Sequence, residues 1–207
     1  MDKKSIPLGL VERIEDPKSF FKDEDNLKQV TSVVRCAFGR NLDQEDIYEH
    51  VTSPEFIYLL RNRTEVLAMA SYNKTSFSGF PSLVVEGIAI KPSIQGQGVF
   101  REITDLVLDE PIICLRTQSP RMYRALEKYC RDVFPKDEKT PKAIEEILRE
   151  LALYLDCKVE ADFIIPCYYG GLFYGEEPTH KNLSNFFKHK LKMNLDQGDA
   201  LLVAGVK

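Results

Sequence analysis

The chain has 207 residues, of which 43% are hydrophobic and 29% charged, and its formal net charge at pH 7 is −4. This length and composition are typical of one soluble globular domain with a sizeable core. The negative net charge argues against broad binding to nucleic acid or to an anionic membrane, so neither is expected as a partner.

The sequence also lacks the signals of a membrane span, of secretion and of a metal site. No apolar run approaches the ~18 residues that a membrane span needs, and residues 1–4 are not followed by the apolar core of a signal peptide. The five cysteines are widely spread without a C-x-x-C pair, and the three histidines have no ligand spacing with them. We therefore expect a reduced, cytoplasmic protein without a metal.

In chain order, the first elements are a strand and two helices. Residues 6–13 are β-like. An acidic start at residues 23–25 and Gly39 bound a helix with apolar positions from 27 to 38. The elements expected next are a helix over 43–51, a hairpin of strands over 56–60 and 65–72, and a long central strand over 83–90 that follows a break at Phe80-Pro81.

The middle of the chain begins with a glycine turn. Helical spacing then predicts a helix over 99–107, and a short buried strand follows over 111–115. Ser119-Pro120 is a strong helix start, and apolar positions line that helix as far as residue 133.

The C-terminal part has less regular patterning. A charged linker over 136–142 leads into a helix that opens at Thr140-Pro141 and has apolar positions to Leu155. The elements expected after it are a strand over 161–169, an aromatic and glycine segment over 168–175, a helix over 183–191 and a last strand over 200–206.

The most informative stretch is residues 84–100, which reads as a buried strand, a bend, a glycine turn and a helix. Backbone N–H groups and the helix dipole make such a turn a candidate anion site. Glycine matters there, because a phosphate approaches the backbone only where no Cβ stands in the way. The run is neither a P-loop nor G-x-G-x-x-G, since Arg101 stands where the last glycine of that motif belongs.

The turn resembles motif A of the GCN5-related N-acetyltransferase family, Q/R-x-x-G-x-G/A after a strand that often carries an acidic residue. Here the motif reads Gln95-x-x-Gly98-x-Phe100, with Glu86 in the preceding strand; Phe100 departs from the usual Gly or Ala. The order of elements up to residue 133 also matches the acetyltransferase core. The resemblance implies an α/β (α+β) fold with a mixed, mostly antiparallel central sheet, splayed strands four and five, and flanking helices.

A single domain over residues 1–207 is expected, because the last strand needs partners in the same sheet. Its expected core comprises residues 6–133, 161–168 and 200–206, with insertions over 134–158 and 170–198.

The resemblance implies an acetyl-CoA-dependent N-acetyltransferase, which moves an acetyl group directly from acetyl-CoA to a primary amine of a small molecule or peptide. Backbone amides of the turn would hold the cofactor's pyrophosphate, and the strand before it would pair with the pantetheine arm. The cofactor-binding residues implied in this way are Ile88, Ala89, Ile90, Gln95, Gly96, Gln97, Gly98, Val99, Phe100 and Ser119.

Two residues are candidates for proton transfer. Glu86 is the expected base, because desolvation in an apolar strand favours the protonated carboxyl group and so suits a base near neutral pH. The family often places a Tyr that acts as the general acid on the helix after strand five, about seven residues past an Asn. Here Leu126 and Ser119 stand at those positions, so Tyr123 is the substitute candidate. The alternatives are a backbone-bonded Glu86 and a core Tyr123.

An aromatic wall could receive the amine, since aromatic faces attract cations. Its candidate residues are Tyr168, Tyr169, Phe173 and Tyr174. The glycines between them would permit a mobile lid, and the alternative is that the rings simply pack on the sheet.

Other function classes stay open at this point. They are an acyl-CoA-binding regulatory module without catalysis, a partner-binding domain without a ligand, and an acyltransferase for longer acyl chains. A homodimer formed through the inserted helices is also left open.

Overall fold

The structure is a computed structural model that describes residues 3–207. The chain divides into two compact units, each discontinuous in the sequence: unit 1 is formed by residues 3–74 and 85–108, and unit 2 by residues 75–84 and 109–207. Strands β4 (Val66–Phe77) and β5 (Phe80–Ile90) pass through both. The fold is mixed α/β with a mostly antiparallel open sheet and flanking helices, as expected; the single domain stays a prediction.

Unit 1 carries five strands in the order β1-β2-β3-β4-β5. The hairpin of β1 (Lys3–Ile6) and β2 (Gly9–Ile14) replaces the single strand expected over 6–13, because Pro7 has no N–H to donate and lies in the turn. Strand β3 (Phe56–Arg61) pairs antiparallel with both β2 and β4.

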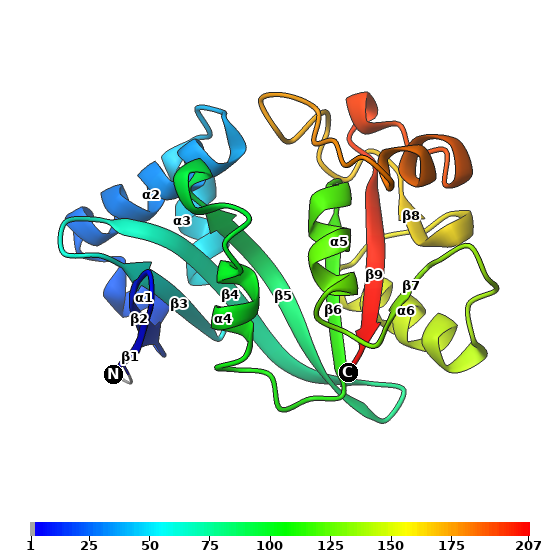
Figure 1. The fold of residues 1–207 in the computed structure, drawn as a ribbon, viewed down its shortest axis with the longest axis horizontal. Helices are drawn as coiled ribbons and strands as arrows, with labels where there is room; N and C mark the ends of the chain where they lie inside the picture. The colour runs from blue at the N-terminus through cyan, green and yellow to red at the C-terminus, as the bar shows by residue number, and fades with distance from the viewer. Residues whose placement is uncertain (1–2) are drawn as a thin grey trace. The chain divides into compact units, whose positions relative to one another are not determined.

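Helices α2 (Glu24–Phe38) and α3 (Gln44–Thr52) cover one face of this sheet, behind the strands in Figure 1. The α2 boundaries confirm the sequence signals: the Asp23 carboxylate accepts from two first-turn amides, and Gly39 ends the helix with φ 64°. A short helix α1 (Pro17–Phe20) precedes α2.

The shared core of α2, α3 and the strands includes Ile57, Leu59, Met69 and Ala89. Tyr72 pairs with Phe56 one position away from Ile57, so it lies on the opposite face. There its hydroxyl hydrogen-bonds Thr104 of helix α4 (Val99–Thr104) at 3.1 Å. Unit 1 therefore has helices on both faces.

In unit 2, strand β6 (Ile112–Thr117) lies between β5 and β9 (Ala200–Val206). Two short strands, β7 (Asp132–Phe134) and β8 (Ile164–Ile165), also pair antiparallel with β9. The bounds of β9 are those predicted, because its continuous apolar run suits a strand buried on both faces.

Two helices cover opposite faces of β6 and β9 (Figure 1). Helix α5 (Pro120–Glu127) brings Leu126 against Gly205 and Ile113. Helix α6 (Lys142–Tyr154) packs on the other face, with Cys114 and Leu202. The insertion expected over 134–158 thus supplies a large part of the core of unit 2.

Several predicted bounds were wrong. Helix α5 ends at Glu127 instead of 133, because Val133 and Phe134 pair with β9 as β7. Only Ile164 and Ile165 of the strand expected over 161–169 are in a strand, after the 3-10 turn η2 (Ala161–Phe163).

Other elements differ from expectation in length or type. The predicted break at Phe80-Pro81 lies inside β5, since Pro81 is close to the strand's start, where a missing N–H is tolerated. The helix expected over 183–191 contains the π-helix η3 (Phe186–Lys190), and the 3-10 turn η4 (Leu195–Gln197) follows it.

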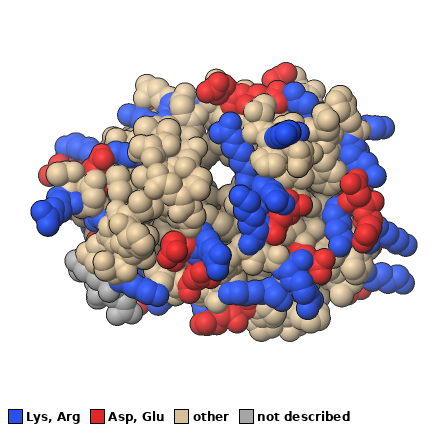
Figure 2. All heavy atoms as spheres, viewed as in Figure 1, with Lys and Arg blue, Asp and Glu red and all other residues tan. Residues whose placement is uncertain are grey.

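Acidic and basic side chains lie next to one another over the face drawn in Figure 2. This mixture fits the small net charge of −4. A mixed face of this kind favours solubility more than attraction of a polyanion.

Helix α6 offers a direct test of its place in the core. Leu148 is 0% exposed and Leu153, on the same helix, is 78% exposed. Leu148→Ala should lower the free energy of unfolding by about 2–5 kcal/mol, because it leaves a cavity in a closed core. The measurement is urea unfolding, with Leu153→Ala as the matched control, for which the expected change is within about 0.5 kcal/mol. Equal effects of the two substitutions would contradict this packing.

Candidate functional site

The glycine turn joins β5 to α4 in unit 1, after the short 3-10 helix η1 (Pro92–Ile94). Gln95 has φ −61° and ψ 147°, Gly96 has φ 77°, and the Gln97 N–H donates to the Ile94 carbonyl at 3.4 Å. These angles define a type II turn, whose third residue needs a positive φ. Gly98 follows with φ 82° and is the N-cap of α4. Both positions therefore favour glycine strongly.

The two glutamines of the turn brace it from within. Gln95 Nε2 donates to the Ile90 carbonyl at 2.9 Å, and Gln97 Nε2 donates to the Ser93 carbonyl at 3.1 Å. Among the described residues, no side chain caps α4 at Gly98. A Cβ added at Gly96 or Gly98 would meet nothing within 4 Å. The turn thus presents backbone to open space, as an approaching anion requires.

The other residues predicted at the cofactor lie in two environments. Ala89, Val99 and Phe100 are buried, and Phe100 is 7% exposed, so its ring lies in the interior and not in the space beside the glycines. Ile88 and Ile90 are partly exposed. The Ile90 carbonyl, one of the groups expected to pair with the pantetheine arm, accepts from Gln95 instead.

Glu86 lies half-buried in β5, next to a polar group of residues on unit 1. Asn73 Nδ2 donates to Glu86 Oε1 at 3.0 Å, while Asn73 Oδ1 accepts from the Glu55 amide at 2.7 Å. The amide side chain therefore fixes one carboxylate oxygen. The partner is a side-chain amide and not the backbone considered as the alternative, and the role of Glu86 as a base stays a prediction.

Side chains of β4 approach β5 at Glu86 and Gly87. Asn73 and Ser71 share one face of β4 with the core residue Met69. Glu86 bonds to Asn73, and a Cβ on Gly87 would point at Ser71 Oγ, 3.2 Å away. Two successive residues of β5 thus lie beside side chains of β4.

His50 of α3 reaches the same place. A Cβ on Gly87 would lie 2.7 Å from His50 Nε2, so a side chain at this position would require the exposed His50 ring to shift. The sequence reasoning considered His50 only as a metal ligand and missed this contact. An isolated glycine inside a strand, directly after the candidate base, was the signal that pointed to a close approach.

The candidates on α5 lie in unit 2. Ser119 is buried and caps α5 through a hydrogen bond from the Met122 amide, and the Tyr174 hydroxyl bonds to it as well. Tyr123 is 1% exposed, and its hydroxyl donates to the Pro135 carbonyl at 2.5 Å. Burial raises the pKa of Tyr123 far above its usual value.

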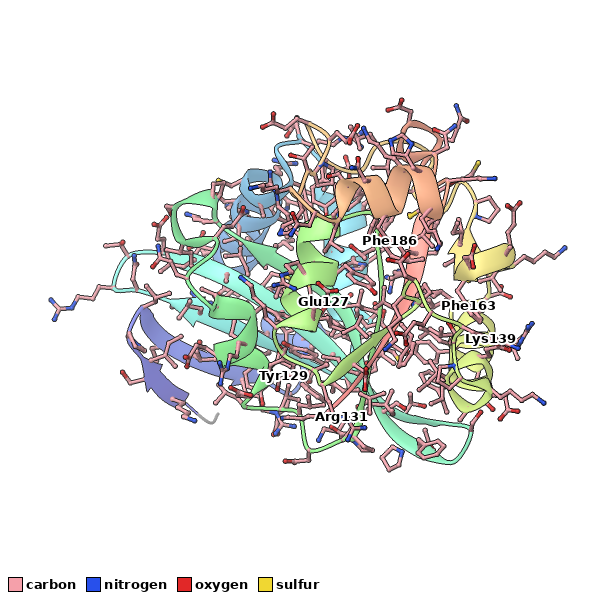
Figure 3. The ribbon with its side chains drawn as sticks, turned by 45° about the vertical axis from the view of Figure 1, so that its right-hand side comes forward. Glu127, Tyr129, Arg131, Lys139, Phe163 and Phe186 are labelled. Atoms are coloured by element: carbon pink, nitrogen blue, oxygen red, sulfur yellow. The ribbon has the colours of Figure 1, made fainter. Side chains whose placement is uncertain are left out.

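The aromatic neighbours of Tyr123 complete a core setting. Its ring lies 5.8 Å from Phe186, labelled in Figure 3, and 5.9 Å from Phe187, both in the π-helix η3. Leu126, which lies in α5 with Tyr123, is fully buried. These contacts give Ser119 and Tyr123 structural functions, and their placement lends no support to a cofactor-binding or catalytic role.

The aromatic segment of unit 2 forms one continuous chain of rings. Successive centroids are 4.9 Å apart for Tyr168 and Tyr169, 4.8 Å for Tyr169 and Phe173, and 5.9 Å for Phe173 and Tyr174. Tyr168 and Tyr169 pack against the core beside α6, and the Arg116 guanidinium lies 5.4 Å from the Tyr168 ring centre. Burial raises the pKa of Tyr169 and of Tyr174.

A single buried side chain fastens this segment to the end of β6. Gln118 Nε2 donates to the carbonyls of Gly171, at 3.2 Å, and Leu195, at 3.3 Å, and its Oε1 accepts from the Phe173 amide at 2.9 Å. These hydrogen bonds hold the segment in place, so they do not support the mobile lid that the glycines were expected to permit. Gln118 carried no sequence signal, since its three partners lie more than 50 residues away.

A surface hollow of about 390 Å³ lies in unit 2, away from all predicted site residues. Its walls are the linker from Pro135 to Thr140, the start of α6, residues 159–163 and Lys190; Lys139 and Phe163 are labelled in Figure 3. Charges of both signs line it, and several are already paired, as in the contact of Lys190 Nζ with Asp137 at 3.2 Å.

Three further features of residues 3–207 bear on other kinds of site. No group of three or more His, Cys, Asp or Glu residues there is arranged to hold a metal ion. None of the described helices has both the length and the apolar character needed to cross a membrane. All five cysteines are free thiols, and burial raises the pKa of Cys130 to about 11, which makes it a poor nucleophile.

The contribution of the Gln118 hydrogen bonds to stability can be measured. Gln118→Ala should lower the free energy of unfolding by about 1–3 kcal/mol for each backbone group that it leaves buried without a partner. Gln197→Ala is the control, because Gln197 is exposed in the neighbouring η4 turn. The check is urea unfolding together with near-UV circular dichroism of the tyrosine cluster, and a Gln118→Ala protein as stable as the control would show that these bonds contribute little.

Solved acetyltransferase structures resemble this chain. A ribosomal-protein-alanine N-acetyltransferase from Escherichia coli is 11% identical, with 95% of this chain and 92% of that chain covered and a TM-score of 0.47. An IAA acetyltransferase from Bacillus cereus is 14% identical, with 95% and 98% covered and a TM-score of 0.46. A GCN5-related N-acetyltransferase from Kribbella flavida is 22% identical over 56% of this chain and 33% of that chain, with a TM-score of 0.38.

No family model and no curated protein sequence matches this chain. At these identities the likeness to solved structures concerns the fold alone. The observed order of elements up to α5 is two strands, three helices, three strands, the glycine turn, a helix, a strand and a helix.

Proposed function

We propose that this protein is an acetyl-CoA-dependent N-acetyltransferase that acts on a primary amine. The observation that carries the proposal is the turn between β5 and α4. Two glycines with left-handed backbone stand there beside open space, at the start of a helix that no described side chain caps. A pyrophosphate needs such exposed amides, and it needs a backbone without side chains in its path.

In this proposal the cofactor is held entirely by unit 1. The amides of residues 97–100 would bind its pyrophosphate, and the edge of β5 near Ile88 would run beside its pantetheine arm. The thioester is already activated, so positioning and backbone hydrogen bonds supply much of the catalysis. Acetyl-CoA is thereby a co-substrate, and transfer to the amine is direct.

Glu86 has the chemistry needed on the amine side. Its carboxylate attracts a substrate ammonium group and takes up the proton that the group must lose before attack. Asn73 supports this role, because its bond to Oε1 orients the carboxylate. The orientation of this carboxylate, in the strand that leads to the glycine turn, supports its proposed role as the base.

A second function, acyl-CoA binding without catalysis, is favoured by one observation. The phenol that the family often places on the helix after strand five has no counterpart on α5, where Leu126 is buried and the Tyr123 hydroxyl is engaged by a backbone carbonyl. A protein of this kind would be stabilised by acetyl-CoA but would release no thiol when amines are added.

The turn is tested by thermal shift with acetyl-CoA. A ligand at 100 times its dissociation constant stabilises the native state by about 2.7 kcal/mol, which is readily seen. Gly98→Asp should abolish the shift, because its carboxylate would stand in the path of the pyrophosphate. Gly79→Asp is the matched control, since Gly79 also has a left-handed backbone, φ 79°, in open space. An undiminished shift in folded Gly98→Asp would refute the phosphate site.

The base is tested by Glu86→Gln. This variant should keep its acetyl-CoA shift and lose about 100-fold or more in kcat for acetyl transfer, within the range reported for positioned bases. The assay is thiol release with a panel of primary amines, and Glu146→Gln, an exposed glutamate on α6, is the control. Full turnover in Glu86→Gln would remove Glu86 from the reaction.

A further inference from the structure

Exposed apolar side chains gather on unit 2 at the C-terminal end of α6. Among residues 3–207, the large apolar side chains that are exposed are Leu10, Phe80, Leu153 and Tyr154, and the last three belong to unit 2. Leu153 is 78% exposed, Phe80 44% and Tyr154 41%. A single exposed apolar residue is ordinary on a protein surface, whereas a group of them marks a surface that another molecule covers.

The tip of the β4–β5 hairpin brings Phe80 to this end of α6. Glu150 of α6 accepts hydrogen bonds from the Ser78 amide at 2.6 Å and from the Ser78 hydroxyl at 2.8 Å. The Phe77 ring, which packs in the core beside α6, lies 5.9 Å from the Tyr154 ring. Phe77 ends β4 and Phe80 begins β5 across a two-residue turn, so their side chains face the same side of the hairpin. Figures 1 and 3 both show the hairpin tip beside α6.

A stripe of four exposed residues continues this surface along α6. Its members follow one another at intervals of four, three and four positions, which places them on one side of a helix. They are Lys142, Glu146, Arg149 and Leu153. Within residues 3–207, the charged side chains of this stripe form no ion pair and no hydrogen bond. The stripe therefore presents one positive, one negative and one further positive charge to the surroundings before it reaches the apolar group.

The charges of the stripe complement a second copy of α6 that runs in the opposite direction. With a two-fold axis between positions 147 and 148, Glu146 would lie opposite Arg149 of the partner subunit, and the reverse pair would form by symmetry. The aliphatic stem of Lys142 would cover Leu153 of the partner subunit and keep its ammonium group in water. A parallel pair would set each charge opposite its own kind, so the charges favour the antiparallel arrangement.

We propose that the stripe on α6 and the tip of the β4–β5 hairpin form the interface of a homodimer. The occupant is a second copy of this chain, because one exposed surface carries both the apolar group and a charge pattern complementary to itself. Helix α6 has 13 residues and is about 20 Å long, so with the hairpin tip it makes a small interface. A dimer of this kind is expected to be weak, with a dissociation constant of about 1–100 μM. The interface uses residues of unit 2 alone, so it stands independently of the proposed function.

The experiment is sedimentation velocity of the full chain between about 1 and 500 μM, where mass action should convert monomer into dimer. Arg149→Glu should weaken the dimer about tenfold or more, because it sets carboxylates opposite one another at two symmetric places. Glu146→Arg should do the same with two pairs of cations. An equimolar mixture of these two variants should associate again, and so should the double variant that carries both changes, since opposite charges face each other in both cases.

Two further variants separate this interface from a general effect of charge. Leu153→Lys should weaken the dimer, because it removes the apolar side chain and sets an ammonium opposite Lys142 of the partner subunit. Lys18→Glu, the same charge change as Arg149→Glu at an exposed position of α1, should associate as the wild type does. The stripe is exposed in the single chain, so all variants should keep the far-UV circular dichroism of the wild type.

Two results would overturn the homodimer. The first is a monomer at every concentration, which would assign the apolar group to a partner of another kind. The second is a wild-type dimer that persists equally in Arg149→Glu and Leu153→Lys, because association would then use a different surface.

Discussion

The left-handed backbone at Gly96 and Gly98 is the constraint on which the proposed chemistry depends. A type II turn reverses the chain after η1, and the second glycine starts α4 without a side-chain cap. Any other residue would strain the turn and place a Cβ in the space where a phosphate group would approach. The side-chain amides of the glutamines at positions 95 and 97 donate hydrogen bonds to carbonyls of the same segment. The loop is thereby held by its own residues while its open side stays free of side chains.

A second constraint acts a few residues earlier in β5. Asn73 holds the Glu86 carboxylate, and Ser71 lies beside the next residue of the strand, Gly87. The His50 ring of α3 occupies the space that a side chain at residue 87 would take. The residue after the candidate base thus lies beside a helix more than 30 residues away in the sequence.

In unit 2, residues of the C-terminal half of the chain form much of the hydrophobic core. Helix α6 buries its apolar face on β6 and β9, and the aromatic segment packs beside it. Gln118 satisfies three backbone groups of the later chain with one buried amide, which uses all but one of its hydrogen-bonding capacities. The rings are thereby ordered by polar contacts as much as by apolar burial. The interactions of Tyr123 follow the same principle, with a buried ring and a hydroxyl that donates to a carbonyl.

Local chemistry in the sequence determined much of this protein. Asp23 and Gly39 bound α2, the Ser119-Pro120 pair starts α5, and the apolar run from 200 to 206 forms β9, because caps, proline and continuous burial act over a few residues. The glycine turn could also be predicted from the sequence, because backbone with a positive φ strongly favours glycine. Tertiary structure alone decided that Val133 and Phe134 leave a helical pattern to pair with β9, and that Gln118 fastens a segment more than 50 residues away. It also decided that His50 lies against Gly87. These contacts join residues distant in the chain, and their energies come from partners that no local pattern specifies.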